Sequence, residues 1–170
     1  MGMPAPAITF DDTTVGEMFD RYARDLLRYA TQRVGEQIAE DIVAQTFLTA
    51  YEQRDRYDPG RGGMLPWLYG ICTNLLRRHR RDEIRALKAV AALRPSNVDG
   101  PTADRVDAQR LAARALATLP RRQRDVLLLY AVAQLEYAEI AAALGIPLGS
   151  VQSALHRARA KVRAALGDHR

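Results

Sequence analysis

A basic segment near the C-terminus carries side chains of the kinds that read nucleic acid. The segment GSVQSALHRARAKVR, residues 149–163, includes Arg157, Arg159, Lys161 and Arg163 and no acidic residue. Arginine and lysine neutralise phosphates, while arginine, glutamine and serine can form hydrogen bonds with base edges. This composition predicts contact with a polyanion, and duplex DNA is the first candidate.

A helical projection at about 100° per residue divides this segment into two faces. Val151, Leu155, Ala158 and Val162 form an apolar stripe, and the opposite face is polar early and basic later. That order suits a recognition helix, whose first residues reach base edges. The small side chains of Ala154 and Ala160 are expected to allow close approach to DNA. The helical residues 137–144 and the Gly145-Ile146-Pro147 turn complete a predicted helix-turn-helix. A plain basic helical hairpin is the alternative.

Residues 54–85 interleave aromatic rings with arginines around a glycine-rich loop at 58–63. Rings that stack on unpaired bases contribute about 1–3 kcal/mol each, and arginines follow the backbone of a single strand. The loop could admit a flipped base. Tyr57, Trp67 and Tyr69 are the candidate rings, and Tyr69 and Thr73 are expected opposite the apolar face of the helix. The alternative is that Trp67 anchors the core and Tyr57 packs at a helix end.

Composition excludes several classes of site. The 170 residues carry 25 Lys and Arg against 20 Asp and Glu, a net charge of +5 that favours a polyanionic partner. One cysteine, Cys72, cannot form a disulfide framework or a cysteine zinc site, and an inert buried thiol is expected. The three histidines have no metal-ligand spacing, and P-loop and G-x-S-x-G motifs are absent. No cofactor, metal or enzymatic activity is predicted. Without an apolar run of membrane-span length or a signal peptide, a soluble cytoplasmic protein is expected.

Helical periodicity dominates the chain, and strand signals are nearly absent. Helices are predicted over 14–33, 38–53 and 65–85, and again from 110, with breaks at 119–120 and 145–147. Residues 86–109 are rich in Pro, Gly, Ser, Asn and Asp and are interpreted as a flexible linker, with short helical pieces allowed at its edges. The prediction is an all-α protein of two small helical domains.

Residues 34–53 carry four acidic residues and no basic residue. Combined with an apolar stripe, this pattern favours a helix that docks on a basic protein surface. The alternative is a solvated acidic face.

Four segments in order resemble the extracytoplasmic-function (ECF) sigma factors of bacterial RNA polymerase: AEDIVAQTFLTAY, RYDPGRGGMLPWLYGICTNLLRRHRR, LATLPRRQRDVLLLYAVAQLEYAEIAAALGIP and GSVQSALHRARAKVR. The resemblance implies an N-terminal tail at 1–13 and a sigma region 2 domain at 14–85, which binds core polymerase and opens the −10 element. It also implies a linker at 86–109 and a sigma region 4 domain at 110–170, which reads the −35 element.

The resemblance also implies roles for single residues. Those for −35 recognition are Ser150, Gln152, Ser153, His156, Arg157, Arg159, Lys161 and Arg163. Those for −10 recognition and melting are Tyr57, Arg61 with the 61–66 loop, Trp67, Asn74, Arg77, Arg78 and Arg81. Those for core polymerase binding are Asp41, Gln45 and Phe47.

The implied partners are promoter DNA, the clamp helices of the largest polymerase subunit, the flap of the second subunit and an anti-sigma factor. Many family members carry Arg where Ala154 stands, so the preferred −35 sequence is expected to be atypical. Two other functions stay open from the residues alone: a stand-alone helix-turn-helix regulator and a protein–protein adaptor.

Overall fold

The computed structural model describes residues 15–93 and 108–167, and within these ranges every regular element is helical. The predicted all-α fold is confirmed. The predicted tail, residues 1–13, and most of the predicted linker lie outside the described residues. The elements are α1 (Val15–Val34), α2 (Glu36–Glu52), η1 (Arg54–Arg56), α3 (Met64–Leu93), α4 (Ala108–Thr118), α5 (Arg121–Ala131), α6 (Tyr137–Leu144) and α7 (Leu148–Gly167).

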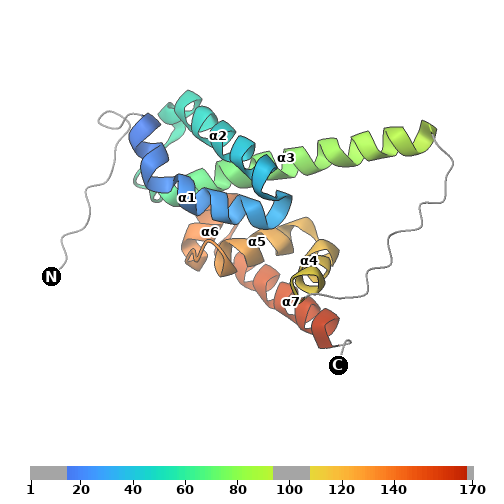
Figure 1. The fold of residues 1–170 in the computed structure, drawn as a ribbon. Coiled ribbons are helices and arrows are strands. Elements are labelled where there is room, and N and C mark those ends of the chain that lie inside the picture. Colours follow the sequence, from blue (N-terminus) through green and yellow to red (C-terminus); the bar gives the residue numbers. More distant parts are fainter. Residues whose placement is uncertain (1–14, 94–107, 168–170) are drawn as a thin grey trace.

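The N-terminal domain consists of α1, α2 and the first half of α3, which pack side by side (Figure 1). Their shared core includes Leu26 of α1, Ile42 of α2 and Leu68 of α3, all buried. Gly35 joins α1 to α2 with a φ of 80°. This left-handed conformation is accessible to glycine at little cost, so the two helices can follow one another almost without a loop.

Helix α3 is longer than predicted. It runs to Leu93, eight residues into the segment 86–109 that was interpreted as a linker, and projects from the body of the molecule (Figure 1). Residues 86–93 read ALKAVAAL, and alanine, leucine and lysine are strong helix formers. The projecting part exposes apolar side chains, among them Leu87 and Val90.

The C-terminal domain consists of α4 to α7. Arg124 closes the end of α4 because its Nε donates to the Leu116 carbonyl at 2.8 Å. Its Nη2 donates to the carbonyls of Ala117 at 2.9 Å and Leu119 at 3.1 Å. Such contacts satisfy carbonyl groups that the helix leaves without partners.

The predicted helix-turn-helix is present as α6 and α7. Gly145 ends α6 with φ 63° and ψ 39°, and the amide of Ile146 donates to the Ala141 carbonyl at 3.1 Å. This left-handed C-cap turns the chain so that α7 follows at an angle of 105° to α6. Ile140, Val151 and Leu155 are buried between the helices.

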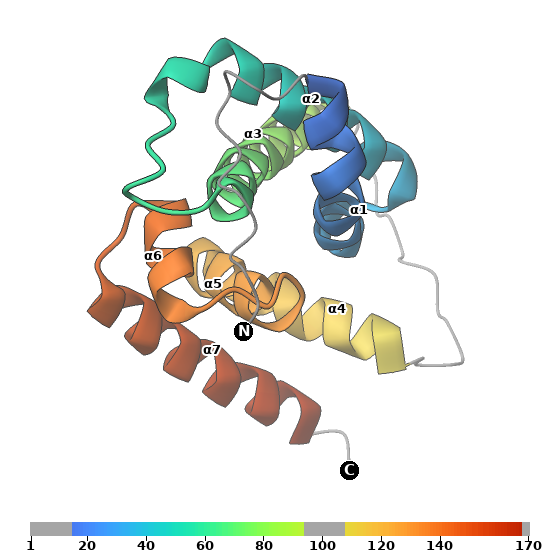
Figure 2. The same ribbon diagram turned by 90° about the vertical axis from the view of Figure 1, so that its left-hand side faces the viewer.

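The two domains pack directly against one another, with α6 beneath the start of α3 (Figure 2). A Cβ atom placed at Gly70 of α3 would collide with the Ala143 carbonyl oxygen of α6. Glycine at this position therefore permits the close approach of the two backbones.

One prediction from the helical projection is wrong, because neighbouring helices enclose the first half of α3. Tyr69 and Thr73 were expected on a polar face, but both are buried. The hydroxyl groups of Tyr29 and Thr73 form a hydrogen bond of 2.8 Å, and the Tyr69 ring meets the Tyr29 ring edge-on at 5.2 Å. Because α1, α2 and α6 surround this part of α3, residues 68–73 are all buried.

Candidate nucleic-acid interfaces

One face of α7 presents most of the predicted −35 residues to solvent. The exposed members are Gln152, Ser153, His156, Arg157, Arg159, Lys161 and Arg163, and Ser150 is half-buried. Val151, Leu155 and Ala158 are buried on the opposite side, as the periodicity predicted, and Val162 is half-buried. A polar face on a rigid helix that is anchored by its apolar face is the arrangement that base readout in the major groove requires.

Two details of this helix differ from the expectation. Ala154 is only 6% exposed, so it packs largely inward and reaches the surface only at the edge of a depression that it lines with Ser153 and Arg157. The guanidinium of Arg159 lies 4.9 Å from the centre of the Tyr130 ring of α5, a cation–π contact that orients it along the domain surface.

Helix α5 adds to this surface residues that the sequence did not single out. Arg122 and Gln123 line a shallow depression of about 340 Å³ together with Ser153 and Arg157. The sequence does contain a hint of this surface, because two adjacent basic residues, Arg121 and Arg122, begin α5. Only the fold places them beside α7.

The second candidate interface is a pocket of about 290 Å³ at the loop before α3. The rings of Tyr57 and Trp67 lie 5.2 Å apart at 48°, and both side chains are half-buried. The Tyr57 hydroxyl donates to the Gly62 carbonyl at 3.4 Å. Arg61 lines the same pocket, and the opposite wall includes Ala142 of α6. The aromatic pair therefore lines an open pocket that meets the other domain.

The arginines of α3 divide into an exposed group and one buried contact. Asn74, Arg78 and Arg81 are exposed, as expected for contacts to DNA strands. Arg77 is instead held by Asp125 of α5: its Nε and Nη2 lie 2.7 Å and 2.6 Å from Asp125 Oδ2. In this arrangement the guanidinium of Arg77, whose side chain is 21% exposed, is engaged by Asp125 and not directed to DNA as the resemblance implies.

Asp125 bridges three helices. Its side chain is fully buried, and its Oδ1 lies 2.6 Å from Nη1 of Arg33 in α1. Burial by itself would lower the pKa of Arg33, but Tyr29 and Asp125 together raise it above the ordinary value. Removing one partner of a buried ion pair leaves an uncompensated charge, which typically costs about 3–5 kcal/mol. We call this set of contacts between Arg33, Asp125 and Arg77 the Asp125 bridge.

Helix α2 presents a surface that differs from both DNA-facing sites. Asp41 and Gln45 are exposed, as predicted for a protein-docking face. Phe47 is only 2% exposed and packs against Phe19 with ring centres 5.2 Å apart, so it supports this face from the core and is not itself a contact residue. Leu48 and Tyr51, 51% and 46% exposed, are the apolar residues of the face that the sequence reasoning missed.

Other site classes find no support in the described ranges. No group of three His, Cys, Asp or Glu residues lies close enough there to hold a metal ion. Cys72 is buried, which raises the pKa of its thiol to about 12. No single helix of the described chain is both long and apolar enough to span a membrane; α6 and α7 meet that standard only as a pair, across their bend.

Comparison with known proteins finds a matching family for each half of the chain. The family described as Sigma-70 region 2 matches residues 18–86, and the family described as Sigma-70, region 4 matches residues 109–162. The RNA polymerase sigma factor NccH of Alcaligenes xylosoxydans xylosoxydans is 31% identical over 92% of this chain and 88% of its own length. The ECF RNA polymerase sigma factor EcfG of Rhodopseudomonas palustris is 34% identical over 75% of this chain and 71% of its own.

A solved structure agrees in fold. The sigma factor RpoE of Bartonella quintana, in complex with the anti-sigma factor NepR, is 22% identical and superposes with a TM-score of 0.69. The likeness covers 91% of this chain and 98% of that one. The relatives favour a sigma factor over a stand-alone helix-turn-helix regulator. Together, the two matched regions and the curated relatives show that this chain belongs to the family of extracytoplasmic-function RNA polymerase sigma factors.

Proposed function

We propose that the chain binds core RNA polymerase through α2 and directs initiation at promoters that its two domains read at separate elements. The domain of residues 14–85 is assigned to the −10 element and that of residues 110–170 to the −35 element. The observation that carries this assignment is the difference between the two interfaces. A long exposed helix face suits a duplex groove, whereas an aromatic pocket suits a single unpaired base.

At the −35 element, α7 acts by hydrogen bonding and charge. Gln152, Ser153, His156 and Arg157 are placed to reach base edges, and a bidentate arginine pair contributes about 1–3 kcal/mol of discrimination between bases. Lys161 and Arg163 lie further along the same exposed side and meet phosphates. The exposed Arg122 of α5 extends the phosphate contact.

At the −10 element, the pocket that Tyr57 and Trp67 line receives an unstacked base. Arg61, Arg78 and Arg81 follow the strand backbone, and Asn74 offers an amide to a base or sugar. None of these groups needs to make or break a covalent bond. The protein supplies binding energy that favours the separated strands, and the polymerase supplies the nucleotidyl chemistry.

The compact arrangement restrains the −10 interface in the free protein. The Asp125 bridge occupies Arg77, and Ala142 forms part of the wall of the base pocket. Strand capture by the complete −10 set, Arg77 included, therefore requires the domains to separate. Docking of α2 on the clamp helices and of the C-terminal domain on the flap would provide the free energy for this opening, because a ligand shifts such an equilibrium by its differential affinity for the two states.

An anti-sigma factor is the remaining proposed partner. A protein that binds both domains in the compact arrangement would keep the −10 interface closed. The sigma factor RpoE of Bartonella quintana was solved in complex with an anti-sigma factor, NepR, which supports a partner of this kind. The site of action is the cytoplasm, where the polymerase and its promoters are.

Run-off transcription with purified core polymerase, this chain and a promoter library tests the proposal. We expect initiation at a small set of promoters that share −35 and −10 sequences. Leu48→Asp should abolish initiation by removing an apolar contact from the α2 face, whereas Leu87→Asp, the same change at another exposed leucine, should not. No promoter-specific transcript, together with tight binding of the free chain to duplex DNA, would contradict the proposal.

A further inference from the structure

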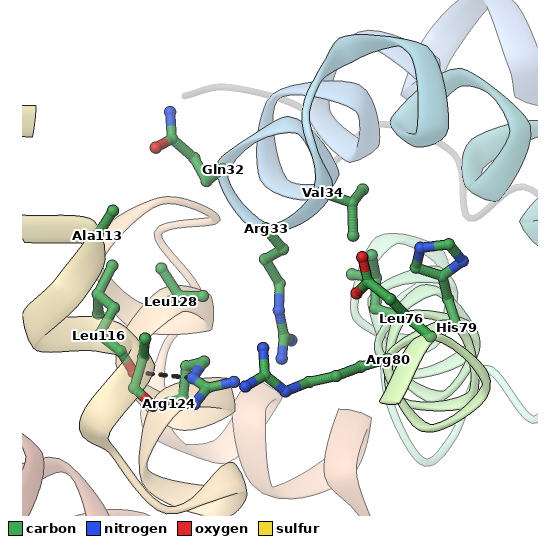
Figure 3. A pocket seen from close by; sticks show the side chains of 12 residues that line it. Gln32, Arg33, Val34, Leu76, His79, Arg80, Ala113, Leu116, Arg124 and Leu128 are labelled. Carbon is green, nitrogen blue, oxygen red and sulfur yellow. Dashed lines mark hydrogen bonds between the residues drawn. The ribbon is translucent and has the colours of Figure 1, made fainter. Parts of the chain in front are cut away.

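A cavity of about 150 Å³ lies between the two domains, apart from the DNA-facing surfaces. Its walls come from α1 and α3 on one side and from α4 and α5 on the other (Figure 3). Val34, Leu76 and Leu116 form apolar parts of the wall. Because both domains line the cavity, a molecule bound in it would contact both at once.

Three arginines from three helices converge on this cavity. Arg33 of α1, Arg80 of α3 and Arg124 of α5 direct their guanidinium groups toward the same space (Figure 3). Glu83 is the one acidic residue among the described lining residues, and its side chain is exposed. Like charges gathered in a partly enclosed space repel one another more strongly than they would in water.

The positive charge of this cluster is only partly neutralised. Arg33 is paired with Asp125, but that carboxylate is shared with Arg77. The Nε and Nη2 hydrogens of Arg124 are donated to backbone carbonyl groups, which are uncharged and do not neutralise its positive charge. Arg80 forms no ion pair within the described part of the chain. Burial, followed by the charges of Arg80 and Arg33, lowers the pKa of Arg124, as expected where positive charge is in excess.

We propose that this cavity binds a compact phosphate-type oxyanion, either inorganic phosphate or a phosphate group of a nucleotide. Guanidinium groups present planar pairs of donors that match phosphate oxygens, and the resulting charge-assisted hydrogen bonds are strong. The volume is about ten times the minimum that one water needs, which leaves room for a phosphate group with some water. A peptide helix, at about 10–12 Å across, does not fit.

Such an anion would hold the two domains together. It would bridge Arg80 of the N-terminal domain and Arg124 of the C-terminal domain, close to the Asp125 bridge. Since binding favours the compact arrangement, the compact arrangement must also favour binding by the same factor. This linkage depends on the contact between the domains and does not depend on the proposed role in transcription.

Isothermal titration of the full chain tests the site, with inorganic phosphate, pyrophosphate and ATP as probes at an ionic strength matched with potassium chloride. We expect saturable binding of one equivalent. Arg80→Ala should weaken it about tenfold or more, since it removes a charged donor. Arg85→Ala is the matched control: it makes the same charge change on the same helix at an exposed residue outside the cavity, and should leave binding almost unchanged. Tighter binding of ATP than of pyrophosphate would identify the nucleotide as the source of the phosphate.

A second readout follows the arrangement of the domains. Fluorophores on the two domains should move closer when phosphate is added to the wild type, and should not respond in Arg80→Ala. Equal weakening by Arg80→Ala and Arg85→Ala would indicate a general counterion effect and overturn the site. Absence of saturable binding would also overturn it, as would binding of a glutamate-rich peptide in place of all three phosphate probes. Run-off transcription by the same preparations separates failure of this site from failure of the proposed function.

Discussion

The two candidate DNA interfaces differ in how much of each the folded chain leaves accessible. On α7, the side chains proposed to read bases are exposed, and among the predicted contacts only Arg159 is engaged by a neighbouring ring. At the start of α3, Arg77 is bound to a buried carboxylate and the base pocket borders the other domain. Under the proposed function, the free protein would contact duplex DNA through α7 while the −10 interface is partly blocked by the other domain. A protein with this arrangement would be less prone to bind single strands away from the polymerase.

Asp125→Asn should have the largest effect on this comparison. The amide keeps the shape but leaves Arg33 and Arg77 without a countercharge, so we expect a loss of about 3–5 kcal/mol in unfolding free energy, or separation of the domains. Urea titration measures the first, and small-angle scattering measures the second through the radius of gyration.

The matched control is Asp82→Asn, which breaks an exposed pair with Arg85 of 3.9 Å and should cost less than about 1 kcal/mol. Equal stability and equal radius of gyration for the two variants would contradict the role of the Asp125 bridge.

Trp67→Ala tests the strand-capturing side. Removal of one stacking ring should weaken binding of an unpaired −10 strand to the holoenzyme by about 1–3 kcal/mol. Affinity for the −35 duplex should not change, because Trp67 is not on that domain. A thermal melting curve, compared with that of the wild type, separates lost stacking from lost folding.

Arg157→Ala tests the duplex-reading side. If Arg157 contacts a base, the variant should lose about 1–3 kcal/mol of affinity and become less selective at one position of the −35 element. Arg163→Ala should instead weaken binding to all sequences alike and reduce the salt dependence by about one phosphate contact. The assignment of Arg157 fails if the two variants lose affinity in the same way.

Gly70→Ala changes no group proposed to contact DNA and acts only on the boundary between the domains. The added methyl group meets the Ala143 backbone, which cannot move away as a side chain would. We expect a cost of about 1–3 kcal/mol or a partial opening of the domains, seen as faster proteolysis between them. Gly167→Ala meets no atom within 4 Å and should leave the proteolysis rate unchanged.

Local patterns in the sequence were sufficient for the helices, apart from the C-terminal end of α3, and for most of the α7 face. The stripe of Val151, Leu155 and Ala158 follows from helical periodicity, and Gly145 marks the turn between α6 and α7. These features depend on residues a few positions apart, so the amino-acid order contains the information.

Features that depend on distant residues were not predicted. Tyr69 is buried because other helices cover it, and no property of its immediate neighbours indicates this. Arg77 lies 48 positions from Asp125, so its partner becomes visible only when the domains are packed together. Most of these errors lie where one part of the chain covers another. The end of α3 is the exception, because residues 86–93 are helical and exposed.

The most direct test of this difference between the interfaces is equilibrium binding of the free full-length chain to the two promoter elements, once run-off mapping has identified them. The wild type should bind the −35 duplex readily and the single-stranded −10 sequence weakly. Asp125→Asn should gain affinity for the single strand while its affinity for the duplex stays the same. Equal binding of the −10 strand by the wild type and by a folded Asp125→Asn variant would contradict the account.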